Sequence, residues 1–130
     1  MRKVVDAIIF DWDWWLLLTR KKDTWILPWW KIDDWETEIE TLSREISEEL
    51  NGAIIKEDTI VPYKVFDWLT PFSWKPISVM TYFSQLTEWI ISHSAEILEA
   101  KYIKDFESVK LSTITREIID TLITDWYIKK

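Results

Sequence analysis

Three glutamates close together in the chain could bind a metal ion. Glu45, Glu48 and Glu49 are spaced three and four residues apart, so on a helix that turns about 100° per residue they lie on one face. Carboxylates at this spacing repel one another unless a cation neutralises them. Oxygen ligands of this kind select a hard ion such as Mg²⁺ or Mn²⁺. Taken alone, however, the pattern is more often typical of a solvated helix surface, because glutamate is a good helix former.

A helix over residues 37–50 is predicted to position these carboxylates. Its apolar residues fall at spacings of three and four, which gives a stripe that packs on a core, and they are Ile39, Leu42, Ile46 and Leu50. Thr37, with Glu40 three residues later, forms a capping box that favours a helix start. Asn51-Gly52 suits the left-handed turn that ends a helix. The three glutamates therefore lie beside the stripe, at the edge of the core.

The residues in and before this helix resemble the sequence box of the Nudix hydrolase family. That box reads Gly, five residues, Glu, seven residues, Arg-Glu-apolar-x-Glu-Glu-x-Gly-apolar. At these spacings the chain has Trp30, Glu36, Arg44-Glu45-Ile46, Glu48-Glu49, Asn51 and Gly52. The segment 25–31 is similar to the family's aromatic-x-Leu-Pro-Gly-Gly-Lys approach to the box. Every charged position of the box is present, whereas Trp29, Trp30 and Trp35 stand where the family has glycine.

The resemblance implies how these residues would act. Glu45, Glu48 and Glu49 would be carboxylate ligands of Mg²⁺, which neutralises a bound diphosphate and activates or orients the attacking water. The main-chain carbonyl of Trp29 or Trp30 would be a further metal ligand.

The same resemblance implies roles for residues that do not bind the metal. Arg44 would hold the site by pairing with a carboxylate, for which Glu36 is the first choice. Arg20 and Lys31 are placed like the cations that neutralise substrate phosphate, although either could equally be an ordinary surface residue. Glu96 is the first choice for a general base outside the box, and Glu99 is the second.

The composition is abnormal in having one glycine and eleven tryptophans, since ordinary usage would give about nine glycines. Ten of the tryptophans lie where turn chemistry favours glycine, and these are Trp12, Trp14, Trp15, Trp29, Trp30, Trp35, Trp68, Trp74, Trp89 and Trp126. One interpretation is a chain altered from one that carried glycine at most of these positions. The other is a tryptophan-rich binding surface. The first also predicts low stability, because each non-glycine residue held at positive φ costs about 1–2 kcal/mol.

The order of the remaining elements favours an α+β protein. Apolar runs predict strands at residues 4–10, 16–19, 53–60, 64–66, 77–86 and 99–103, and the spacing of isoleucines and leucines predicts a second helix over 112–125. Strands before, between and after the helices favour a mixed sheet over a doubly wound fold. The resemblance implies a Nudix-like α/β/α sandwich. With 130 residues, we expect a single domain over 1–130.

Charge and composition exclude several classes of protein. A net charge of −7 disfavours binding to a nucleic acid polymer. The lack of cysteine excludes disulfides and thiolate metal sites and is compatible with a cytoplasmic location. No stretch approaches the roughly 20 apolar residues that span a bilayer, so we expect no membrane segment.

Together, these features predict a Mg²⁺-dependent pyrophosphohydrolase of nucleoside diphosphate-linked substrates, with Mn²⁺ as the other candidate cofactor and a small nucleotide as the partner. A first alternative is a Nudix-like scaffold without catalysis, because Trp29, Trp30 and Trp35 occupy glycine positions of the catalytic loop. A second is an aromatic surface module for carbohydrate or a membrane interface. Neither the particular nucleotide nor the oligomeric state follows from the sequence.

Overall fold

The fold was analysed in a computed structural model, which describes residues 2–50, 52–69, 75–87 and 99–129. The strands are β1 (Arg2–Ile9), β2 (Leu16–Lys21), β3 (Thr24–Ile26), β4 (Trp29–Lys31), β5 (Val61–Leu69), β6 (Pro76–Ser84) and β7 (Glu99–Ile103). The helices are α1 (Glu38–Glu49) and α2 (Thr113–Thr124), with short 3₁₀ turns η1 (Glu57–Thr59) and η2 (Phe106–Ser108). None of the described helices is long and apolar enough to cross a bilayer.

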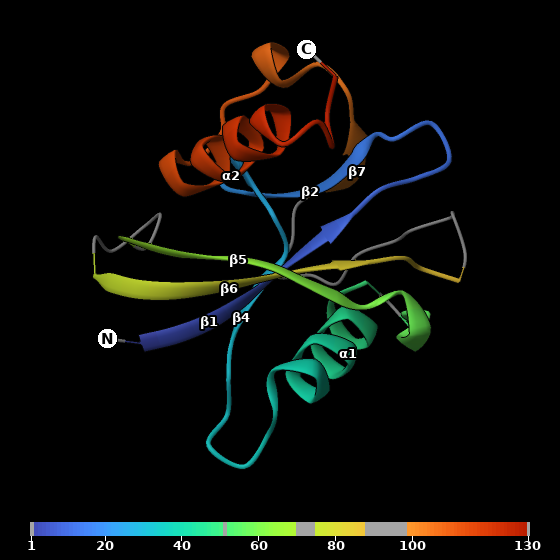
Figure 1. The fold of residues 1–130 in the computed structure, drawn as a ribbon, viewed down its shortest axis with the longest axis vertical. Helices are drawn as coiled ribbons and strands as arrows, with labels where there is room; N and C mark the ends of the chain where they lie inside the picture. The colour runs from blue at the N-terminus through green and yellow to red at the C-terminus, as the bar shows by residue number, and fades with distance from the viewer. Residues whose placement is uncertain (1, 51, 70–74, 88–98, 130) are drawn as a thin grey trace.

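The described strands form two sheets. The larger sheet has the order β4-β1-β6-β5, in which β1 pairs with β6 in parallel and the other two pairings are antiparallel. The smaller sheet, β3-β2-β7, is antiparallel. In Figure 1, α1 and α2 lie on opposite sides of the larger sheet. The predicted α+β sandwich with a mixed sheet is therefore confirmed.

Strand β1 divides the core into two clusters, because successive side chains of a strand point to opposite faces. Val4 and Ile8 pack in the cluster that contains α2 and much of the smaller sheet. Val5, Ala7 and Ile9 pack in the cluster that contains α1. Both faces of β1 are thus buried, which explains why its sequence is a nearly continuous apolar run. The apolar run from Val4 to Ile9 contains one charged residue, Asp6, which is itself buried.

Both predicted helices are present, and their ends have recognisable caps. Thr37 and Glu40 form the predicted capping box of α1. Gly52, at φ 87°, donates its N–H to the Ser47 carbonyl at 2.6 Å and closes the other end. The Ser112 side chain accepts the N–H of Thr115 at the start of α2.

Two sequence-based expectations differ from the structure, and two short strands were not expected. Residues 53–60 do not form a strand but contain η1 and a single bridge at Ile55, because Lys56, Glu57 and Asp58 interrupt the apolar run with polar side chains. The short strands β3 and β4 were not predicted. Ile39 was expected in the buried stripe of α1 but its side chain is 45% exposed, since it lies in the first turn, before the helix packs on the sheet.

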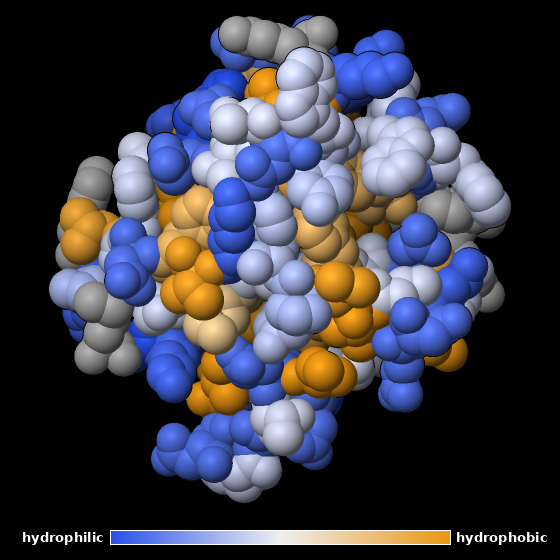
Figure 2. Space-filling view, viewed as in Figure 1, coloured by the Kyte–Doolittle hydropathy of each residue, from blue (hydrophilic) through white to orange (hydrophobic). Residues whose placement is uncertain are grey.

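The turn tryptophans fall into two groups. Trp14 and Trp126 are held at positive φ, 63° and 69°, as expected of glycine positions. The other turn tryptophans within the described residues have ordinary backbone angles, while Trp74 and Trp89 lie outside the described residues. The side chains of Trp12, Trp14, Trp35 and Trp126 are all more than half exposed. Figure 2 shows hydrophobic residues gathered over the middle of one face, between charged residues of the two ends.

Candidate active site on helix α1

Helix α1 presents the box glutamates beside its buried face. Leu42 and Ile46 have no exposed surface and anchor the helix on the larger sheet. The Glu45 side chain is 21% exposed and the Glu48 side chain 58%. Glu45 and Glu49 thus lie at the border between the core and the solvent, whereas Glu48 is exposed.

Arg44 joins the loop before α1 to the helix itself. Its Nε and Nη2 donate to the two carboxylate oxygens of Glu36, at 2.8 and 2.7 Å. Nη2 also donates to Asp33 at 3.1 Å. Such two-pronged guanidinium–carboxylate pairs fix geometry as well as charge. The expected pairing of Arg44 with Glu36 is therefore present, and it holds the loop against the helix.

The third nitrogen of the same guanidinium contacts two of the candidate metal ligands. Nη1 donates to Glu45 at 3.0 Å and to Glu48 at 3.2 Å. Arg44 therefore stands among four acidic side chains, those of Asp33, Glu36, Glu45 and Glu48. This positive charge offsets the repulsion between carboxylates on one helix face.

The environment shifts the pKa values of two of these carboxyls in opposite directions. Hydrogen bonds from Arg44 lower the pKa of Glu36. Glu36 therefore stays ionised more readily than a free carboxyl and keeps its pairing with Arg44. Burial raises the pKa of Glu45, an effect that the nearby Arg44 only partly offsets. Glu45 thus holds its charge less readily than Glu36, and a cation bound next to it would favour the ionised form.

The donors at this site suit a hard divalent cation by their chemistry. All are carboxylate oxygens, and Glu45 and Glu48 converge on one nitrogen of Arg44. Within the described residues, no group of three or more acidic or histidine side chains is already arranged around a common point. The residues therefore fit such an ion in kind, and their side chains would have to turn from Arg44 to bind it.

The two tryptophans of β4 pack against the two core clusters, one on each side of the strand. The Trp30 indole is 5% exposed and packs with Leu42 and Ile46 of α1. Trp29 packs on the other side, in the cluster that contains α2. The Nε1 atoms of both are buried and have no partner among the described residues. Trp30 thus fills the interior on one side of β4, and the partly buried Trp29 covers the core on the other side.

The structure brings Lys31 near the box but not Arg20. Lys31 lines a hollow of about 500 Å³ next to Glu36, together with Arg2, Lys3 and Asp33. Arg20 lies on the smaller sheet, where its Nε donates to Glu99 at 2.9 Å. Glu96, the candidate general base, lies outside the described residues.

Sequence reasoning missed two acidic residues. Asp33 shares Arg44 with Glu36, but it is not part of the box, and in the sequence it is simply one of two adjacent aspartates. Asp6 pairs with Trp29 across β1 and β4 and is 5% exposed. The signal for Asp6 was available, because it is the single charged residue within the first apolar run.

The chain is structurally similar to Nudix hydrolases. It superposes on a NUDIX hydrolase from Nitrosomonas europaea with a TM-score of 0.76 at 17% identity, covering 95% of this chain and 89% of that one. The NUDIX domain of Shewanella oneidensis NrtR, solved with ADP ribose, gives 0.77 at 16% identity and coverages of 97% and 88%. The MutT protein from Methanosarcina mazei Go1 gives 0.74 at 20% identity and coverages of 99% and 96%.

Sequence comparison adds no closer relationship, because no family model and no curated protein matches the chain. The structural likeness establishes the fold: this chain has the fold of the Nudix hydrolases, as the resemblance around the box implied. At such low sequence identities, a shared fold does not establish the substrate or the activity of this protein.

Proposed function

We propose that this protein is a Mg²⁺-dependent pyrophosphohydrolase of nucleoside diphosphate-linked substrates. The observation that supports this most is the contact of Arg44 with Glu45 and Glu48 of α1 and with Glu36 of the preceding loop, within a Nudix hydrolase fold. The ADP ribose bound to the structurally similar Shewanella domain is consistent with a nucleotide-sized substrate.

Glu45, Glu48 and Glu49, together with the main-chain carbonyl of Trp29, would hold the metal ion. Bound there, Mg²⁺ or Mn²⁺ would supply charge neutralisation for the diphosphate and lower the pKa of a water molecule. Arg44 would orient the helix carboxylates through its contacts with Glu36 and Asp33.

The remaining proposed residues act on substrate charge and on the proton of the attacking water. Lys31, in its hollow beside Glu36, would bind substrate phosphate. Arg20 is a second candidate for phosphate binding, and it would need to exchange Glu99 for substrate. Glu96 would accept the proton of the attacking water.

The experiment is a screen for phosphate or pyrophosphate release from nucleoside diphosphate derivatives, with and without Mg²⁺. Glu48→Gln and Glu49→Gln keep side-chain size but remove a charged ligand, and each is expected to lower turnover by a factor of at least about 100. Glu45→Gln should behave in the same way. Circular dichroism must show that each variant is folded, and unchanged turnover in folded Glu48→Gln would refute the proposal.

A non-catalytic scaffold is the second candidate, and the tryptophans of β4 favour it. In a Nudix-like box with glycine at these positions the backbone can approach a metal and a diphosphate closely, whereas Trp30 fills the space between β4 and α1 with an indole. Calorimetry decides between the two candidates. Mg²⁺-dependent binding of a nucleotide that Glu48→Gln abolishes would exclude the scaffold.

A further inference from the structure

A second hollow lies at the opposite end of β1 from the box. The hollow beside Lys31 is lined by Arg2 and Lys3, at the start of β1. The second hollow is lined by Ile8 and Phe10, at its end, and has a volume of about 560 Å³. None of its lining residues belongs to the box. Its size is typical of a pocket for a small organic ligand.

Aromatic rings from three segments of the chain line this hollow. Phe10 and Trp14, on either side of the turn after β1, have their ring centroids 5.4 Å apart. Phe83 of β6 and Tyr127, beyond α2, have theirs 4.7 Å apart. The Trp12 side chain, 76% exposed, also lines the hollow. The lining of the hollow is therefore rich in aromatic rings, and offset stacking is a favoured contact between such rings and an aromatic ligand.

The charges that line the hollow are one lysine and one aspartate, and they differ in what they already bind. Asp11 accepts the backbone N–H groups of Asp13 and Trp15 on its Oδ1, both at 2.9 Å. Lys56 is half-buried, and the described residues give its ammonium no ion-pair partner. Its backbone is fixed, because its N–H donates to the Gln85 carbonyl at 2.8 Å. Lys56 is therefore the positive charge in the lining of this hollow with which an anionic group can pair.

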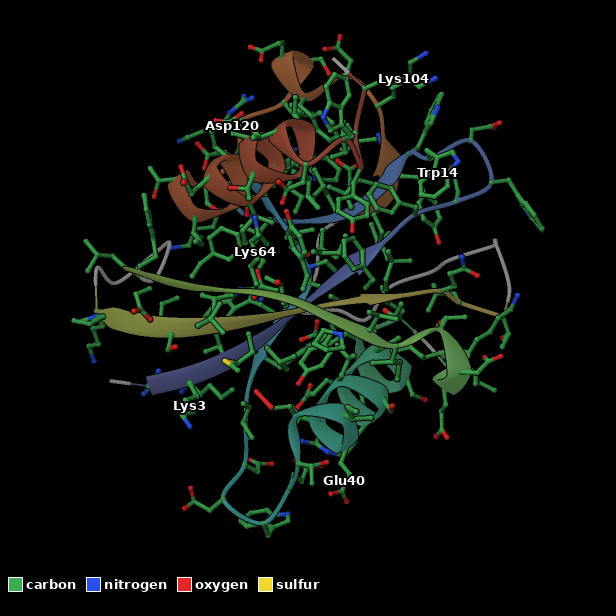
Figure 3. The ribbon with its side chains drawn as sticks, in the orientation of Figure 1. Lys3, Trp14, Glu40, Lys64, Lys104 and Asp120 are labelled. Carbon is green, nitrogen blue, oxygen red and sulfur yellow. The ribbon has the colours of Figure 1, made fainter. Side chains whose placement is uncertain are left out.

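We propose that this hollow binds a planar heteroaromatic ring that carries an anionic group, a ligand of the size and chemistry of a nucleoside monophosphate. The ring stacks on the aromatic side chains, and the anion pairs with Lys56. The hollow shares no lining residue with the box, so the proposal stands independently of the hydrolase activity. Figure 3 shows Trp14 at the same end of the molecule as Lys104, far from Glu40 in the first turn of α1.

The chain offers a ring-removing variant that does not threaten the fold. Trp14 is at positive φ, so Trp14→Gly removes the ring and relieves backbone strain together. Trp126→Gly is the matched control. Trp126 is also at positive φ and exposed, but it does not line this hollow. Lys56→Gln removes the positive charge and keeps most of the side-chain length.

The test is isothermal calorimetry with adenosine monophosphate as the probe, in EDTA so that no divalent metal ion takes part. Trp14→Gly should weaken binding by about fivefold or more, the range expected for loss of one stacked ring, whereas Trp126→Gly should not. Lys56→Gln should also weaken binding and should remove its dependence on ionic strength. Adenosine, without the phosphate, and ribose 5-phosphate, without the base, should each bind more weakly than the whole nucleotide.

Other outcomes would overturn the proposal. Adenosine binding as tightly as its monophosphate would remove the role of Lys56. Equal affinities of the Trp14→Gly variant and the unaltered protein would remove the role of the rings. Weakening by Glu48→Gln but not by Trp14→Gly would place the nucleotide at the α1 carboxylates instead, and that result would leave the proposed hydrolase function standing.

Discussion

At the scale of single residues, the two strained tryptophans mark positions where glycine fits better. Trp126 directly follows the last residue of α2 and its cap, and its N–H donates to the Ile123 carbonyl while the Tyr127 N–H donates to the Leu122 carbonyl. This is the bonding pattern of a helix end that usually carries glycine in the left-handed conformation. Trp14 has the equivalent conformation within the loop that joins β1 to β2, and such hairpin loops also favour glycine.

Trp126→Gly should therefore stabilise the protein. The Trp126 side chain is 91% exposed, so its removal loses little packing, and relief of the left-handed strain is expected to add about 1 kcal/mol to the free energy of unfolding. Trp35→Gly is the control, because Trp35 is 82% exposed but has an ordinary φ. Urea unfolding should show a gain only for Trp126→Gly, and equal changes in both variants would contradict the interpretation.

Asp6 should make stability fall as the pH rises. Its carboxyl lies among apolar side chains, and burial raises its pKa well above the usual value. Because the folded protein holds this proton more tightly than the unfolded chain, the contribution of Asp6 declines from about pH 4, the unfolded pKa, up to the raised folded pKa. Carboxyls with lowered pKa values, such as Glu36 and Glu99, act in the opposite direction.

The contribution of Asp6 is therefore measured as a difference between two proteins. Asp6→Asn removes the titrating group and keeps its size, so the difference in unfolding free energy, variant minus unaltered protein, should grow with pH above about pH 4. Chemical unfolding at several pH values gives this difference directly. A difference that is constant with pH would show that Asp6 has the same pKa in both states.

At the scale of elements, the cap of α1 sets where the helix starts and so where its carboxylates lie. The Thr37 hydroxyl accepts the Glu40 N–H at 3.1 Å, and the Glu40 carboxylate accepts the Thr37 N–H at 3.0 Å. Thr37→Ala should lower the free energy of unfolding by about 1 kcal/mol. Thr37→Ser keeps the hydroxyl and should lose much less. Similar losses in both variants, measured by thermal unfolding, would show that the hydroxyl does not carry the effect.

The elements that could be predicted from the sequence are those with strong periodicity. The spacing of Leu42, Ile46 and Leu50 identified α1, because these side chains are buried and repeat at the helical period. Strands β3 and β4, of three residues each, are too short to show a period. Strand β4 also depends on hydrogen bonds with β1, which lies far back along the chain, whereas β3 pairs with β2 in a local hairpin.

At the scale of the whole molecule, the site could be predicted only as far as the box extends. The pair Arg44–Glu36 was predictable because both belong to the box, and the structure joins them. The contribution of Asp33 was not, because its contact with Arg44 depends on the path of the loop. The second hollow was also beyond the sequence, because Phe10, Phe83 and Tyr127 meet there only through the fold.

Metal binding should couple the site to the stability of the whole fold. An ion that binds only the folded protein raises its stability, by about 2.7 kcal/mol at a concentration of 100 times the dissociation constant. Mg²⁺ or Mn²⁺ should therefore raise the melting temperature of the protein, and EDTA should reverse the rise. Glu48→Gln should lose this response, because it removes a carboxylate ligand. Glu57→Gln, in the exposed turn η1, is the control and should keep it.

If both variants respond like the unaltered protein, the metal does not bind through Glu48. No response even in the unaltered protein would favour the non-catalytic scaffold, in which the Trp30 indole packs between β4 and α1.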